Sequence, residues 1–387
     1  MQMKLLFCGD VCFTNHTVSP EQAGVILRDV LPVAQRADFV IANCETVLAD
    51  RTTVEPIAKS GPNLVDRPEN ICFFEALGTD VAVLANNHIG DFGEKGTMDT
   101  IALLQEHHIR TVGAGANLED AYKACHLEKN GIQISILAVC ENEFGMATKT
   151  TAGTAGLKLG LLHNRIREEK QQGGYCIVVC HGGNEFNPVP SPKVMERYRL
   201  FCDMGADAVG AMHTHCPQGY EWYGGKPIIY SLGNFFFTPR QGVKKTSDNS
   251  WFYGYMAELS IENGVMTMCP IPYRFDPMGS KITVFAQEER DKMMAYLEKL
   301  SAVLENEDAV ANYFTGWTYR YPWSPVQITD LTACLENDYP YTGEFNLLSC
   351  EAHNEKLTEA YRIMMKRDVE KARYWAEKSI ELEKMPV

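Results

Sequence analysis

The segment VAVLANNHIGDFG occupies residues 81–93 and combines two patterns that decide the fold. Its first half, residues 81–85, is a short and fully apolar run, which is typical of a strand that is buried on both faces of a sheet. Asn86, Asn87 and His88 follow this run without any spacer. The segment therefore predicts a buried strand whose carboxyl end delivers a group of polar side chains.

The same order of apolar run and polar exit recurs through the first two-thirds of the chain. Asp10 follows the run Leu5–Cys8, and Glu45 follows Phe39–Asn43. His181 follows Tyr175–Cys180, and the pair His213 and His215 follows Ala208–Ala211. Amphipathic stretches lie between the runs and predict helices over Gln22–Ala34, Glu69–Leu77, Gly96–His107 and Pro192–Met204. This alternation predicts an α/β protein. Because ligands bind at the carboxyl edge of such sheets, we expect the polar residues to meet there.

The pattern changes after about residue 276. Amphipathic spacing predicts a helix over Gln287–Leu304, and Asn354–Glu383 has the composition of one long charged helix. Trp317–Pro325 is rich in Trp, Tyr and Pro, so we expect a loop that covers the cleft, forms an oligomer contact or packs the extension onto the core. We therefore divide the chain into a main domain at residues 1–275 and a mostly helical extension at residues 276–387.

Composition restricts the cellular context and the partners. The formal net charge of -14 argues against general nucleic-acid binding, because phosphate backbones attract basic surfaces. The 13 cysteines include no Cys-x-x-Cys pair and several lie in apolar runs, which is typical of reduced thiols. No apolar stretch reaches the length of a membrane span, and the first one is too short for a signal peptide. These features predict a cytoplasmic protein.

The polar residues at the strand ends are the kinds that hold metal ions. Carboxylates, an amide oxygen and neutral imidazoles suit Mn, Fe or Zn better than Ca. More than four candidates are present, so we expect two divalent ions. The candidate metal ligands are Asp10, Glu45, an amide of the Asn86–Asn87 pair, His181, His213 and His215.

Other polar residues beside these motifs have supporting roles in the prediction. His88 could donate a proton to a leaving group, because the pKa of imidazole lies near neutrality. Five further residues either bind substrate and orient the ligands or only shape their turns, namely Asn43, Asn86, Asp91, Glu185 and Asn234.

The motifs resemble those of the CapA family of poly-γ-glutamate capsule biosynthesis proteins, a branch of the calcineurin-like metallophosphoesterase superfamily. The matching segments are Phe7–Val11, Ala42–Glu45, Ala85–His88 with Asp91 and Gly93, His181–Glu185, Gly210–His215 and Lys226–Phe235. Together they span about residues 3 to 240. The resemblance implies a four-layer αββα sandwich with the site at one end of its two sheets.

The resemblance also implies a role for each ligand. One metal ion would be bound by Asp10 and His215. The other would be bound by Asn87, His181 and His213, and Glu45 would bridge the two ions. His88 would be the proton donor. Superfamily phosphatases usually carry Asp-x-His in the first motif, where this chain has Asp10-Val11-Cys12.

Three functions are compatible with these residues. The first is a metal-dependent phosphoesterase, in which two cations about 3.5–4 Å apart lower the pKa of a bridging water and the resulting hydroxide attacks in line. The second is a non-catalytic accessory protein of poly-γ-glutamate or related polymer synthesis. The third is a metal-dependent hydrolase of γ-glutamyl amide bonds. In each case we expect a small-molecule or polymer substrate that bears phosphate or carboxylate groups.

Overall fold

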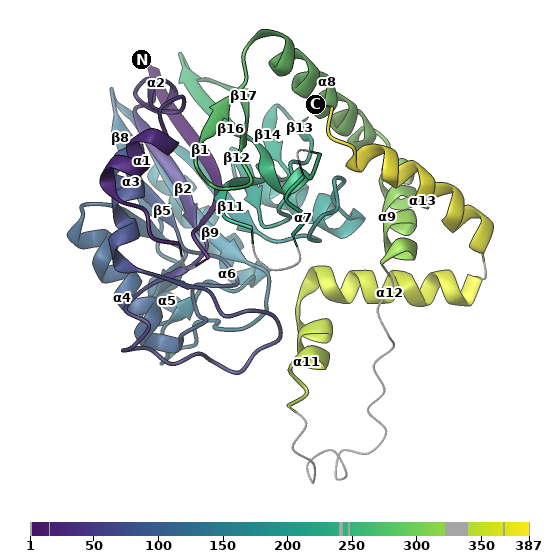
Figure 1. The fold of residues 1–387 in the computed structure, drawn as a ribbon, viewed down its shortest axis with the longest axis horizontal. Coiled ribbons are helices and arrows are strands. Elements are labelled where there is room, and N and C mark those ends of the chain that lie inside the picture. Colours follow the sequence, from purple (N-terminus) through teal and green to yellow (C-terminus); the bar gives the residue numbers. More distant parts are fainter. Residues whose placement is uncertain are drawn as a thin grey trace.

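The computed structural model describes residues 2–14, 16–239, 243–246, 248–321, 340–366 and 368–386. An 8-stranded and a 6-stranded β-sheet lie face to face, and helices cover their outer sides (Figure 1). The predicted α/β fold is therefore confirmed, including its four-layer αββα arrangement.

The first sheet is built around β1 (Gln2–Cys12). Parallel to it on one side follow β2 (Phe39–Cys44), β5 (Val81–Val83) and β6 (Arg110–Val112). On its other side β1 pairs with β15 (Asn234–Phe237), in parallel, and with β16 (Tyr253–Glu262), which is antiparallel to it. The sheet continues from β16 through the antiparallel strands β17 (Val265–Phe275) and β18 (Ile282–Val284). The carboxyl ends of β1, β2 and β5 thus lie at one edge.

The second sheet repeats this arrangement. Its parallel strands are β9 (Ile132–Cys140), β11 (Tyr175–His181), β12 (Ala208–Met212) and β14 (Lys226–Ile229), and its antiparallel edges are β8 (Cys125–Lys129) and β13 (Tyr220–Tyr223). Two small pairs lie outside both sheets, namely β3 (Val47–Leu48) with β4 (Val65–Asp66) and β7 (Ala114–Gly115) with β10 (Gly153–Thr154).

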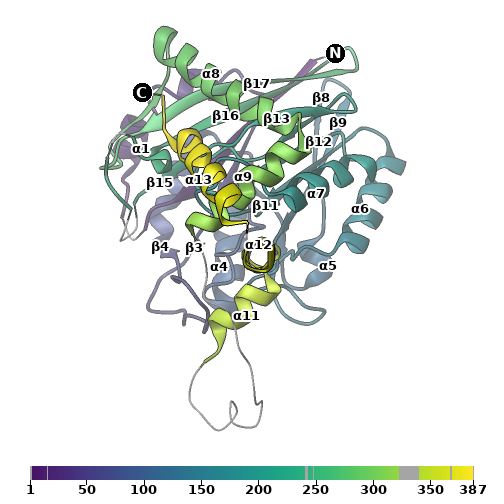
Figure 2. The same cartoon turned by 90° about the vertical axis from the view of Figure 1, so that its right-hand side faces the viewer.

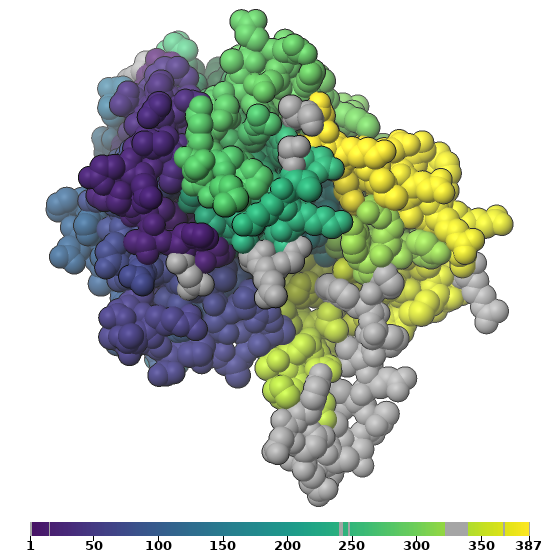
Figure 3. Space-filling model, viewed as in Figure 1, coloured from purple at the N-terminus to yellow at the C-terminus, as the bar shows by residue number. Residues whose placement is uncertain are grey.

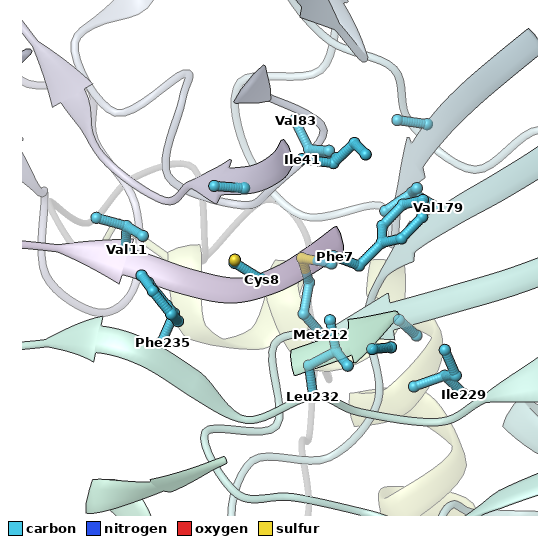
Figure 4. Close-up of a cluster of buried hydrophobic side chains, with 14 of the residues drawn as sticks. Phe7, Cys8, Val11, Ile41, Val83, Val179, Met212, Ile229, Leu232 and Phe235 are labelled. Atoms are coloured by element: carbon cyan, nitrogen blue, oxygen red, sulfur yellow. The ribbon is translucent and has the colours of Figure 1, made fainter. Parts of the chain in front are cut away.

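The two sheets share one hydrophobic core. Figure 4 shows Phe7 of β1 and Ile41 of β2 in the same cluster as Val179 of β11 and Met212 of β12. All of these side chains are buried. Because the runs are apolar at every position, the strands bury both faces, one against the other sheet and one against helices.

Helices of the main domain cover the outer faces. On the first sheet lie α1 (Pro20–Ile26), α2 (Leu31–Ala34), η1 (Pro68–Asn70), α3 (Ile71–Leu77) and α4 (Gly93–Glu106), and on the second lie α6 (Leu159–Gln172) and α7 (Pro192–Asp203). Two short helices, α5 (Leu118–Ala121) and η2 (Ser250–Phe252), lie in connections. The single helix predicted over Gln22–Ala34 is wrong, because the chain turns between α1 and α2 and restarts with Pro32 in the first turn.

The C-terminal extension is helical, as predicted, but two details differ. Its helices are α8 (Gln287–Leu304), α9 (Glu307–Arg320), α11 (Thr342–Ser349), α12 (Glu351–Lys366) and α13 (Val369–Glu383). The predicted single helix over Asn354–Glu383 is wrong, since Asp368 caps a new helix through its side chain. The loop predicted from Trp317 is helical as far as Arg320, because Val310, Phe314 and Trp317 form one buried face of α9. Residues 322–325 lie outside the described residues.

The extension packs against the main domain through α8, which contacts β13 and β17, and through α9, which contacts α7. Figure 2 shows α9, α12 and α13 on one side of the sheets, and Figure 3 shows the yellow C-terminal residues against the green residues of α8. Within the extension, the hydroxyl of Tyr296 on α8 donates a hydrogen bond of 2.7 Å to the Leu382 carbonyl on α13. The division at residue 275 stays a prediction. None of the described helices combines the length and the apolar character needed to cross a bilayer.

Candidate metal centre

The predicted ligands converge where the carboxyl ends of both sheets meet. Asp10 lies near the end of β1, Glu45 directly after β2, and His181 ends β11. His213 and His215 follow β12, and Asn87 follows β5. Each of these six side chains belongs to a residue that is at most 7% exposed. Six polar residues from five strand ends therefore occupy one buried position.

Two groups of ligand atoms form within this cluster. The first group consists of Glu45, His181 and His213. The second group consists of Asp10, Glu45 and His215. Within each group the ligand atoms lie within 4.8 Å of one another. Glu45 belongs to both groups, as expected for a carboxylate that bridges two cations. Buried clusters of His, Asp and Glu of this kind are typical of metal binding.

The first group is closely packed around His181. Its Nε2 lies 3.0 Å from Asn87 Oδ1, 3.0 Å from His213 Nδ1 and 3.5 Å from Glu45 Oε1. Burial lowers the pKa of His181 to about 4 and that of His213 to about 3. Both rings are therefore neutral at pH 7, which is the form of imidazole that binds metals.

The second group is oriented by partners outside it. Asn234 Oδ1 can only accept, so the 2.8 Å contact makes His215 Nδ1 the donor and leaves Nε2 as the ring nitrogen that could bind a metal ion. Asp10 accepts a hydrogen bond of 2.7 Å from Asn43 Nδ2 and one of 3.1 Å from the His213 backbone N–H. These contacts fix the direction of both ligands.

The geometry of the backbone explains how His213 and His215 both face inward. In an extended strand they would point to opposite sides, but their φ angles are 110° and 54°. Such positive φ values are costly for residues other than glycine and persist where the surrounding structure imposes them. The strained turn after β12 therefore aims both rings at the cluster.

The amides Asn43 and Asn86 build the frame around the ligands. Asn86 Nδ2 donates to Asn43 Oδ1 at 3.2 Å and to the Cys44 carbonyl at 2.8 Å. Its Oδ1 accepts from the backbone N–H groups of His88 and Ile89 at 3.1 and 2.9 Å. Asn86 thus closes the turn that presents Asn87 and His88, while Asn43 connects that turn to Asp10.

The electrostatics of the cluster favour a bound cation. Burial and the neighbouring Glu45 raise the pKa of Asp10 to about 8. Two carboxylates this close in a buried position repel each other, and a divalent cation between them relieves the repulsion. Together with the neutral imidazoles, this donor set fits divalent metal ions.

His88 lies at the border of the centre. Its Nε2 is 4.0 Å from Glu45 Oε1, and its Nδ1 donates to Asp91 Oδ2 at 2.7 Å. Asp91 also forms a buried ion pair of 2.5 Å with Lys59. The structure therefore places Asp91 behind His88 as the group that orients its ring.

Cys12 does not point into the centre. Its Sγ lies 3.6 Å from Asp66 Oδ2, and burial together with Asp66 raises the pKa of the thiol well above its usual value. A thiol of this kind stays protonated and is a poor metal ligand. The first motif accordingly supplies Asp10 but no second ligand.

Two charged contacts near the centre could not be found by sequence analysis. Lys59 comes from a loop with no distinctive pattern. Glu141 follows β9 and pairs with Arg197 of α7 at 2.5 Å, and it also accepts from the Gly183 N–H at 3.2 Å. The only available signal was the apolar run of β9 before Glu141, which matches the other strand ends.

Comparisons with known proteins agree with the motifs. The family model described as bacterial capsule synthesis protein PGA_cap matches residues 4–239. The capsule biosynthesis protein CapA of Bacillus anthracis is 28% identical over 309 residues, which cover 77% of this chain and 73% of that protein. The PGA biosynthesis protein CapA of Bacillus subtilis is 29% identical over 302 residues, covering 75% and 78% of the two chains. The resemblance inferred from the motifs is thereby confirmed.

Among solved structures, a 5′-nucleotidase precursor from Thermus thermophilus is similar to this chain. The TM-score is 0.39 and the sequence identity 12%, over 79% of this chain and 60% of that one.

Proposed function

This chain belongs to the bacterial capsule synthesis protein family, and we propose that it is a metal-dependent hydrolase with phosphoesterase chemistry. The observation that carries the proposal is the pair of ligand groups that share Glu45, with His88 Nε2 only 4.0 Å from the shared carboxylate. A proton donor beside a two-cation centre is the arrangement that ester cleavage requires.

The proposed ligand sets follow the two groups. In the proposal, one divalent ion is held by Asp10 and His215. The other is held by Asn87, His181 and His213, and Glu45 contacts both ions. The mixture of neutral imidazoles and oxygen ligands favours Mn, Fe or Zn. When bound, two such ions supply a water of lowered pKa and a positive clamp for phosphoryl oxygens.

The residues of the chain have distinct tasks in this proposal. His88 would act in its doubly protonated form and give its Nε2 proton to the departing oxygen, while its Nδ1–H stays bonded to Asp91. Asp91 and its ion pair with Lys59 hold the ring of His88 in place. Asn43, Asn86 and Asn234 orient ligands through the contacts described above, and Glu185 lies at the open side, 3.9 Å from His215 Nε2.

A second candidate is a non-catalytic role in polymer synthesis. The observation that favours it is the position of Cys12, which faces Asp66 and leaves the ion at Asp10 with one ligand fewer than a motif with histidine would supply. A relative from Mycobacterium tuberculosis, 29% identical over 180 residues, carries the name probable polyglutamine synthesis accessory protein. In this role the centre would bind carboxylate or phosphate groups of the polymer without cleaving them.

The experiment that separates these candidates combines metal analysis with hydrolysis of an aryl phosphate ester in the presence of Mn²⁺. We expect wild-type protein to bind metal and to turn over. His88→Ala should retain the metal and lose turnover by about 100-fold or more, the usual contribution of a general acid. His107→Ala is the matched control, because His107 also contacts a carboxylate, Glu75, but lies far from the centre on the surface.

Each other outcome assigns the function differently. Metal binding without turnover in the wild type supports the accessory role. Equal metal loss and turnover loss in His88→Ala contradicts the proton-donor role, and wild-type protein that takes up no metal refutes the centre itself.

A further inference from the structure

The ligand group around Asp10 offers three side chains to a metal ion. It consists of Asp10, Glu45 and His215, whose ligand atoms lie within 4.8 Å of one another. Cys12 does not join this group, because its Sγ faces Asp66 at 3.6 Å. Protein-bound transition-metal ions usually have four or more ligands, so an ion at this group has room for a further donor.

Glu185 brings a carboxylate to this group. Its Oε1 lies 3.9 Å from His215 Nε2, the ring nitrogen that could bind a metal ion. Two donor atoms that bind one ion at about 2.0–2.2 Å lie roughly 3–3.5 Å apart. In the other group, His181 Nε2 and Glu45 Oε1 are 3.5 Å apart. A side-chain movement of less than about 1 Å would therefore make Glu185 a ligand of the same ion as His215.

The loop that carries Glu185 is anchored on both sides of this residue. Asn184 Nδ2 donates a hydrogen bond of 3.0 Å to the Ala352 carbonyl on α12. The Phe186 N–H donates one of 2.7 Å to the carbonyl of Thr214, which lies between the two histidines after β12. Phe186 adopts a φ angle of 61°, a costly value that persists where the surrounding structure imposes it. These contacts fix the backbone of Glu185 beside the turn after β12.

The negative charge of Glu185 acts on the centre. Burial lowers the pKa of His181 and of His213, and the charge of Glu185 opposes this shift in both rings. The Glu185 side chain is 31% exposed, compared with 1% for His215. Glu185 therefore lies at the border of the centre, where its charge adds to the negative potential that attracts a cation.

A lysine of the C-terminal extension interacts with the same carboxylate. Lys356 of α12 lines a pocket of about 320 Å³ together with Glu185 and Trp317. Burial lowers the pKa of Lys356 to about 8, and the charge of Glu185 opposes this shift. The Lys356 Nζ also lies 4.6 Å from the ring centroid of Trp317. A carboxylate has two oxygens that each accept, so an interaction with Lys356 leaves Glu185 able to bind a metal ion as well.

We propose that Glu185 is the fourth protein ligand of the ion held by Asp10, Glu45 and His215. A first motif of the form Asp-x-His would supply this ligand from position 12, whereas here it comes from the loop after β11. Through Lys356 and Asn184, the C-terminal extension then contacts the metal centre by way of one of its ligands. The inference rests on the metal centre of the proposed function, but not on its turnover.

The test measures metal binding by the full chain after treatment with EDTA and removal of the chelator. Co²⁺ is the probe, because its visible absorption depends on the number and kind of its ligands. We expect the wild type to bind two Co²⁺ ions. Glu185→Gln keeps the size of the side chain and removes its charge, so it should weaken one site by about tenfold or more and leave the other within about threefold. The absorption of the weakened site should change as well.

Three further variants make this result specific. His215→Ala removes a predicted ligand of the same ion and should weaken the same site. Glu185→Asp keeps the charge but has a shorter reach, so its affinity should stay about fivefold or more below that of the wild type. Glu258→Gln is the matched control, because Glu258 is also partly exposed and contacts a lysine, Lys4, at 3.1 Å, but lies beside Leu6 in the body of the first sheet. A thermal melt of each variant verifies folding.

Equal weakening of both sites in Glu185→Gln would indicate a general effect of charge and would overturn the proposal. Wild-type affinity in Glu185→Gln or in Glu185→Asp would do the same, and a wild type that takes up no Co²⁺ would refute the whole centre. These outcomes do not involve turnover. A selective loss of one site in Glu185→Gln, together with a wild type that does not cleave the aryl phosphate ester, would keep the ligand and reject hydrolysis.

Discussion

The ion pair between Glu141 and Arg197 should contribute strongly to stability, because both partners are buried. The two side chains are 2% and 10% exposed, and the Oε1–Nη1 distance is 2.5 Å. Replacing Arg197 by Met keeps most of the apolar stem but leaves the Glu141 carboxylate without its counter-charge. Removing one partner of a buried ion pair costs about 3–5 kcal/mol. We therefore expect Arg197→Met to lower the free energy of unfolding by about this amount.

The pH dependence of that loss has a defined sign. Burial alone would raise the pKa of Glu141, but Arg197 and the Gly183 N–H hold it below its usual value. A carboxyl with a lowered folded-state pKa stabilises the protein above its unfolded pKa of about 4.3, and this stabilisation disappears as the pH falls through the folded-state pKa. The difference between wild type and Arg197→Met should be largest near neutral pH. It should shrink as the pH falls, first when Glu141 of the variant, which lacks Arg197, takes up a proton and finally when Glu141 of the wild type does.

The assay is urea denaturation followed by circular dichroism, at pH 7 and at acid pH. Lys95→Met is the matched control, because the Lys95–Asp99 pair is exposed and should contribute less than about 1 kcal/mol. Adding Glu141→Gln to Arg197→Met removes the uncompensated charge and should recover part of the stability. A loss below about 1 kcal/mol in Arg197→Met, or a double variant no more stable than the single one, would refute the reasoning.

A further prediction concerns the first motif. Cys12→Ala should leave metal content and turnover unchanged and cost about 1 kcal/mol of stability in urea denaturation; a loss of metal would show that the thiol is a ligand.

The fold of the main domain could be predicted because its strands are marked by short stretches of neighbouring residues. Strands such as β2 and β11 are short apolar runs that lead directly into a polar residue, Glu45 after β2 and His181 at the end of β11. The direction of parallel strands then brings distant residues such as Asp10 and His181 to one edge without further information. The six predicted ligands lie together in the structure for this reason, although their roles as metal ligands stay a prediction.

The burial of Lys59 and Lys356 could not be predicted, because nothing in the sequence next to either lysine indicates it. Both are single lysines in polar surroundings, which is the ordinary composition of a solvated loop or helix face. They become buried only through partners far along the chain, Asp91 for Lys59 and Trp317 for Lys356. The helical character of Trp317–Arg320 was hidden in a similar way, since the aromatic residues and the following prolines favoured a loop.

Glu141 shows why the extension and the centre are best regarded as one functional unit. One of its oxygens, Oε2, accepts from the Gly183 N–H, two residues after the predicted ligand His181, and from the Ala352 N–H on α12, both at 3.2 Å. Arg197 holds the other oxygen. A single carboxylate thus fixes the loop that carries the ligand relative to the helix that carries Lys356. Glu141→Gln removes the charge that holds Arg197 and should therefore lower turnover in the aryl phosphate assay, and unchanged turnover would contradict this coupling.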